Sequence, residues 1–167
     1  MTRAPVTRAP VTRAPVTLTL ATLSLATLGL AGCSPTVSLS PAPSASAPAC
    51  AEVTVRLPDT VDGQRRVWTD AQATGAWRNA EGTTTVVLTC GLEEPGPSTL
   101  PCQSIDGVDW LVDDSEAPNY RLTTFGREPA AQVYLDSGVV SAVQALSDLA
   151  DAVGRLPTTG AVCTSTP

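Results

Sequence analysis

The chain has 167 residues, with 16 acidic and 10 basic side chains that give a formal net charge of −6. Every basic side chain is arginine and histidine is absent, which removes the commonest general base, the commonest zinc ligand and any Schiff-base lysine. From Cys33 onward, seven arginines accompany sixteen acidic residues, and the resulting net charge of −9 argues against a nucleic-acid partner.

The N-terminal stretch has the pattern of an export signal. Residues 2–16 repeat Thr-Arg-Ala-Pro-Val three times and supply a positively charged start, and residues 16–30 are apolar but too short to span a bilayer. Leu30-Ala31-Gly32-Cys33 then resembles the lipobox of bacterial prolipoproteins. We therefore predict a lipoprotein signal peptide over 1–32, cleavage between Gly32 and Cys33, and lipidation of Cys33. An ordinary secretory signal, with Cys33 incidental, is the alternative.

Two or more acyl chains hold a protein stably on a membrane. The predicted location is therefore the extracytoplasmic face of the cell membrane, with the membrane itself as one partner through the lipid anchor. Residues 33–48 consist mostly of Ser, Pro and Ala without charge, a composition typical of a flexible linker. The remainder, 49–167, is predicted to form a single α+β extracytoplasmic domain.

The five cysteines support export independently. Lipidation of Cys33 would leave an even set that can form two disulfides in an oxidising compartment. Three pairings are possible, and the short Pro- and Gly-rich loop 91–101 favours Cys90 with Cys102, which leaves Cys50 with Cys163. A metal site is the weaker alternative because the chain has no Cys-x-x-Cys spacing and no histidine, so no metal or cofactor is expected.

Hydrophobic periodicity predicts strands over 83–90, 108–112, 121–125 and 131–135, with turns over 114–119 and 126–129. Residues 52–57 alternate and favour another strand, although a short helix after Cys50 competes with it. Residues 139–153 have the spacing of an amphipathic helix that Gly154 and Pro157 end. The predicted architecture is a small antiparallel β-sheet packed against a C-terminal helix.

Two motifs invite a functional interpretation that their context weakens. Residues 156–160 match the Leu-Pro-x-Thr-Gly sorting signal, but no hydrophobic segment and basic tail follow, so a helix stop and a turn fit better. Five acidic residues between 106 and 116 suggest a cation site or a catalytic pair, yet their spacing matches no calcium loop and favours a solvated edge. These residues are Asp106, Asp109, Asp113, Asp114 and Glu116.

Tryptophan and arginine are frequent in binding hot spots, and this selects the candidate binding residues. For the tryptophans the competing interpretation is burial in the core. A turn after Gly126 favours exposure of Arg127, which could equally cap a carboxylate cluster. Trp68 and Tyr134 are further residues that could contribute to binding. The candidates are Trp77, Trp110, Arg121 and Arg127.

Several segments together resemble a known family. They include Leu88-Thr89-Cys90-Gly91, Asp106-Gly107-Val108-Asp109-Trp110-Leu111 and Thr123-Thr124-Phe125-Gly126-Arg127-Glu128-Pro129-Ala130. In this order the series is similar to an actinobacterial lipoprotein family catalogued as domain of unknown function 3515. The resemblance implies a single exported domain and supplies no activity, ligand or catalytic residue.

The predicted function is that of a membrane-anchored lipoprotein that serves as a binding or accessory module for an envelope protein or a cell-wall component. A carboxylate-dependent envelope hydrolase is the alternative, and a purely structural surface protein is a third. A deep pocket that holds two carboxylates would favour the enzyme, whereas an exposed apolar patch would favour a protein partner.

Overall fold

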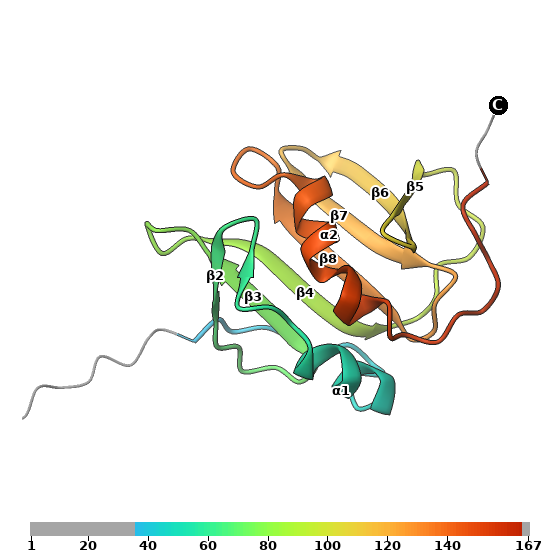
Figure 1. Cartoon of the computed structure of the whole chain (residues 1–167), viewed down its shortest axis with the longest axis horizontal. Coiled ribbons are helices and arrows are strands. Elements are labelled where there is room, and N and C mark those ends of the chain that lie inside the picture. Colours follow the sequence, from blue (N-terminus) through green and yellow to red (C-terminus); the bar gives the residue numbers. More distant parts are fainter. Residues whose placement is uncertain (1–35, 165–167) are drawn as a thin grey trace, which may run out of the picture. The chain divides into compact units, whose positions relative to one another are not determined.

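The computed structural model describes residues 36–164, which form an eight-stranded antiparallel sheet and two helices (Figure 1). Across the sheet the strands follow the order β1-β2-β3-β4-β8-β7-β6-β5. The predicted signal peptide, the cleavage after Gly32 and the lipidation of Cys33 lie outside the described residues. The elements in chain order are α1 (Pro48–Val55), β1 (Thr60–Val61), β2 (Gln64–Val67), β3 (Thr74–Arg78), β4 (Thr84–Leu92), β5 (Cys102–Ile105), β6 (Val108–Glu116), β7 (Asn119–Phe125), β8 (Ala130–Asp136) and α2 (Ala142–Val153).

Both helices pack on one face of the sheet, and the hydrophobic core lies between them and the strands (Figure 1). Buried residues alternate along β8, at Ala131, Val133 and Leu135, because successive side chains of a strand point to opposite faces. The predicted α+β fold, with a sheet against a C-terminal helix and two disulfides, is confirmed. The largest side chains of this core include Trp77, Leu88, Trp110, Leu122, Leu135, Leu146 and Leu149.

The four predicted strands between residues 83 and 135 are confirmed as β4, β6, β7 and β8. The strand β6 continues to Glu116, so the turn predicted over 114–119 is shorter than expected. The predicted C-terminal helix is confirmed as α2, but it begins at Ala142 rather than at residue 139. Ser141 is its N-cap and accepts a hydrogen bond from the Gln144 amide. Residues 139–141 therefore lie outside the helix.

The strand favoured over 52–57 is wrong, and the competing short helix is right. Helix α1 starts at Pro48, where the fixed φ of proline suits the first turn. Its buried residues are Cys50 and Val53, three apart as on one helical face, whereas Val55 is 76% exposed. The alternation of valines that suggested a strand therefore did not reflect burial.

Four strands were not predicted from the sequence, namely β1, β2, β3 and β5. Two of the connections carry an Asp-Gly signal for a tight hairpin: Asp62-Gly63 joins β1 to β2, and Asp106-Gly107 joins β5 to β6. All four of these residues have positive φ, between 44° and 78°, as the type I′ turn of a two-residue hairpin requires. This turn signal, rather than the hydrophobic pattern, could have found β1, β2 and β5, but it does not border β3.

The stretch that was expected to be a flexible linker is attached to the domain over its described residues. Val37 forms a parallel bridge with Thr69, and Ala45 is buried beside Gly91. The Ser44 amide donates to the Gly91 carbonyl at 2.9 Å, and a Cβ on Gly91 would meet the Ala45 nitrogen at 2.4 Å. Small side chains leave the backbone accessible and so suit this close contact. Composition alone does not distinguish such a packed segment from a flexible spacer.

The disulfides join Cys50 to Cys90 and Cys102 to Cys163, so the favoured pairing of Cys90 with Cys102 and of Cys50 with Cys163 is wrong. Cys90 lies in β4 and Cys102 in β5, and three strands lie between them in the sheet. Four strand spacings separate β4 from β5 by about 19 Å, far beyond the reach of a disulfide. Closeness in sequence therefore did not produce closeness in space.

Candidate binding groove

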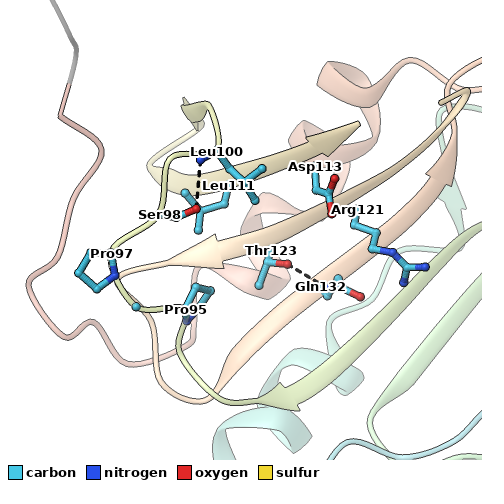
Figure 2. A pocket seen from close by; sticks show the side chains of 10 residues that line it. Pro95, Pro97, Ser98, Leu100, Leu111, Asp113, Arg121, Thr123 and Gln132 are labelled. Carbon is cyan, nitrogen blue, oxygen red and sulfur yellow. Dashed lines mark hydrogen bonds between the residues drawn. The ribbon is translucent and has the colours of Figure 1, made fainter. Parts of the chain in front are cut away.

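The face of the sheet opposite the helices carries a groove beside the loop 93–101 (Figure 2). Its volume is about 300 Å³, and its wall has both polar and apolar side chains. Strands β6, β7 and β8 supply the floor, and the loop supplies two prolines and a leucine. The lining residues are Pro95, Gly96, Pro97, Ser98, Leu100, Leu111, Asp113, Arg121, Thr123 and Gln132.

Strand register places the floor residues side by side. Thr123 pairs with Leu111 on one side and with Gln132 on the other. The Gln132 Nε2 donates to the Thr123 Oγ1 at 3.0 Å, which fixes both side chains on the open face (Figure 2). Two residue pairs along the strands, and so on the same face, Asp113 lies opposite Arg121. The groove therefore has a defined polar floor rather than a loose surface.

Arg121 is held by a small cluster at one end of the groove. Its Nη2 lies 2.7 Å from the Glu116 Oε1, and its guanidinium lies over the Tyr134 ring, 4.9 Å from the centroid. The Tyr134 hydroxyl donates to the other Glu116 oxygen at 3.2 Å. Because all three side chains contact one another, the cation is presented to solvent in a fixed position.

Hydrogen bonds lower the pKa of both acidic groups near this end. The hydrogen bond from Arg121 lowers the pKa of Glu116, and hydrogen bonds from Ser115 lower the pKa of Asp113. Desolvation, together with the hydrogen bond to Glu116, raises the pKa of Tyr134. Both carboxyls are therefore ionised at neutral pH, an arrangement that suits binding and does not favour the proton donor that a hydrolase would need.

Of the four predicted binding residues, only Arg121 lies in this groove. Trp77 and Trp110 are fully buried in the core, where they cannot contact a partner at the surface. The Trp77 indole nitrogen donates to the Pro58 carbonyl at 3.1 Å, whereas the Trp110 indole nitrogen has no hydrogen-bond partner among the described residues. The structural interpretation of both tryptophans therefore holds.

Arg127 is only 7% exposed, so the exposure predicted for it is wrong. Its guanidinium donates to the carbonyls of Gly154, Leu156 and Gly107, at 3.1, 2.7 and 3.1 Å. Burial lowers the pKa of Arg127, and its guanidinium stays charged, as arginine does in proteins. The residue thus joins the end of α2 to the turn before β6 and has a structural role.

The acidic residues between 106 and 116 do not form one cluster. Asp109 accepts a hydrogen bond from the Cys163 amide at 2.7 Å, and Asp106 accepts one from the Ser147 hydroxyl. Asp113 lines the groove, and Glu116 pairs with Arg121 at the end of the groove. Within residues 36–164, no group of three or more His, Cys, Asp or Glu side chains is placed to hold a metal ion.

A second hollow, of about 590 Å³, lies on the helix-bearing side between α1 and the segment that links β2 to β3. Trp68 stands at this hollow and is 80% exposed, the most exposed of the large hydrophobic residues in the described chain. Arg66 reaches inward and donates to the Leu57 carbonyl at 2.9 Å, and burial lowers its pKa. Trp68 was singled out in the sequence, but nothing there indicated this hollow.

The sequence did not select Thr123, Gln132 or the loop prolines as site residues. Alternation on β7 and β8 would have placed Thr123 and Gln132 opposite the core, on the same face as Arg121. The position of the loop over that face has no comparable signal.

Comparison with known proteins finds one match. A family model described as "Protein of unknown function (DUF3515)" matches residues 12–160. No curated protein and no solved structure matches the chain.

Proposed function

Because the chain belongs to the family of proteins of unknown function DUF3515, we propose its role from its own residues: a lipid-anchored, extracytoplasmic binding module of the cell envelope. The observation that carries this proposal is that all four cysteines of the described domain are paired in disulfides. Disulfides persist in exported proteins and are rare in the reducing cytoplasm. Cys33, the remaining cysteine, stands at the end of the predicted signal peptide.

No helix within the described residues is long and apolar enough to cross a membrane.

The groove beside Arg121 supports the binding role. Its volume is at the small end of the range for ligand sites, so it suits a short segment rather than a large ligand. The lining has hydroxyl, amide and guanidinium groups beside prolines and leucines, and it lacks the aromatic side chains on which sugar rings stack. We therefore favour a peptide segment of an envelope protein as the partner.

The anchor is tested by the intact mass of the protein purified from its native membrane. We expect a chain that begins at Cys33 and carries acyl mass, and we expect a Cys33→Ala variant to lack this mass. Reduction should add about four hydrogens, one for each sulfur of two disulfides. A native chain without lipid would contradict the predicted lipid anchor. Free thiols at the other four cysteines would contradict an oxidising, extracytoplasmic location.

The groove is tested by photocrosslinking in intact cells from position 123 on its floor. The matched control is position 143 on α2, where Val143 is 60% exposed on the helix-bearing side. We expect a discrete crosslinked envelope protein from position 123 that is absent from position 143 and is lost when Arg121→Ala is added. Equal crosslinking from both positions, or a product that is insensitive to Arg121, would contradict the groove as the binding site.

A further inference from the structure

We propose that the surface around Trp68 lies against the lipid bilayer to which Cys33 anchors the chain. This inference rests on the proposed lipid anchor and extends it, because it assigns the face of the domain that contacts the membrane. It is carried by the exposure of Trp68, by the place where the N-terminal segment joins the domain, and by the distribution of charge.

Trp68 is unusual for a domain whose other two tryptophans are fully buried. A tryptophan residue that is 80% exposed leaves a large apolar area in water. Val55, at the last residue of α1, is 76% exposed, and its neighbour Thr54 lines the same hollow as Trp68. Tryptophan is enriched where membranes meet water, since its ring is apolar and its N–H can stay hydrated.

The N-terminal segment joins the domain at Trp68 itself. The Val37 amide donates to the Trp68 carbonyl at 2.9 Å, and the Asp70 amide donates to the Val37 carbonyl at 3.2 Å. The Leu39 amide and the Ser38 hydroxyl bind the Asp70 carboxylate at 2.8 and 2.7 Å, and these hydrogen bonds lower the pKa of Asp70. This side of the domain is therefore fixed to the segment that follows Cys33.

Covalent geometry limits how far this surface can lie from the anchor. Cys33 precedes Val37 by four residues, which fully extended span at most about 14 Å. A lipid group on Cys33 that inserts into the bilayer would thus keep the Trp68 backbone within about that distance of the anchored residue. Among the exposed apolar side chains of the described residues, Trp68 is the one directly attached to this segment.

Charge favours the same orientation. Residues 36–78 contain four arginines and four acidic residues, whereas residues 79–164 contain three arginines and twelve acidic residues. Anionic headgroups in the membrane would repel the acidic part of the domain. The neutral part, which carries Trp68, can approach the headgroups without this penalty.

The test uses the fluorescence of the lipidated protein, purified from its native membrane and reconstituted in phosphatidylcholine vesicles with or without brominated acyl chains. Trp77 and Trp110 are buried in the core, so the difference between the native protein and Trp68→Phe isolates the emission of Trp68. We expect the brominated lipid to abolish most of the Trp68 emission, and we expect aqueous iodide to leave that emission unchanged. The Trp68→Phe variant should lose no emission to either quencher, and a Val143→Ala variant should be quenched as the native protein is.

Quenching of Trp68 by iodide but not by brominated lipid would overturn the proposal, because the ring would then face water. Protection from both quenchers would also overturn it and would indicate that this chain or a second copy of it covers Trp68. To separate this inference from the anchor, the unlipidated chain from Cys33 onward is coupled through the Cys33 thiol to a maleimide lipid in the same vesicles. Missing acyl mass on the native protein refutes the anchor alone, whereas iodide quenching in the coupled protein refutes the membrane-facing surface.

Discussion

Arg127 is a charged residue that the fold uses to satisfy three backbone carbonyls. Its guanidinium lies between the residues that end α2 and the turn before β6, at a position only 7% exposed. An arginine can serve several carbonyls at once because its donors form a planar fork, which the single ammonium of lysine cannot reproduce.

Replacement of Arg127 by alanine should therefore lower the free energy of unfolding by about 3 kcal/mol, because one buried carbonyl and two partly buried carbonyls lose their donor. Denaturant unfolding measures this change, and Arg127→Lys should give a smaller loss. Arg155, which forms an exposed ion pair with Asp151, is the matched control, and its change to alanine should cost less than about 1 kcal/mol. Similar losses for Arg127→Ala and Arg155→Ala would show that burial of the guanidinium does not determine how much an arginine stabilises the fold.

The ion pair between Arg121 and Glu116 should make the end of the groove sensitive to acid. The pKa of Glu116 is lowered in the folded protein, chiefly by the hydrogen bond from Arg121. The stabilisation from the pair is therefore present above the ordinary glutamate pKa and is lost as the pH falls through the lowered folded value. Carbon NMR of the carboxyl group should show a lower midpoint for the native protein than for Arg121→Ala. An unchanged midpoint would indicate that Arg121 does not stabilise the carboxylate, and Arg155→Ala should leave the midpoint as it is.

At the scale of elements, the sequence predicts best where hydrophobic periodicity coincides with burial. The strands β4, β6, β7 and β8 and the helix α2 line the core, so their patterns predicted them. The edge strands β1 and β5 and the short strand β2 have little buried surface and depend on their turns. Strand β3 has small buried residues such as Gly75 and Ala76 that no periodicity identifies. For the site, alternation could supply the polar floor, but the course of loop 93–101 depends on a disulfide pairing that sequence distance does not determine.

The two disulfides should differ in their contribution to stability. They close loops with sequence separations of 40 and 61, and the chain-entropy model gives about 4 kcal/mol for each. Cys50 and Cys90 are fully buried, whereas Cys102 and Cys163 are half-buried, so removal of the first pair also leaves a gap in the core. We expect the double change of Cys50 and Cys90 to alanine to reduce the free energy of unfolding more than that of Cys102 and Cys163, as measured by denaturant unfolding. The opposite order would contradict the contribution of core packing.

For the whole molecule, the concentration of acidic residues after residue 78 should make stability depend on salt. Like charges on one part of the domain repel each other, and ions screen this repulsion. We expect the midpoint of thermal unfolding to rise when the ionic strength increases from about 10 mM to about 150 mM, where the screening length falls to about 8 Å. Asp114→Asn, at an exposed position, should raise the midpoint at low salt and change it little at high salt. A midpoint that salt lowers would contradict this account.

The order of the disulfides along the chain has a mechanical consequence. Their loops are sequential and do not overlap, since one closes at Cys90 before the other opens at Cys102. If the domain is pulled from its two ends and unfolds, the bridges carry the force past both loops, so only about 27 of the described residues can straighten, to about 100 Å. Without the bridges the same chain could extend to more than about 400 Å. A protein held at one end by a membrane and at the other by a partner would therefore act as a short tether even after its fold is lost.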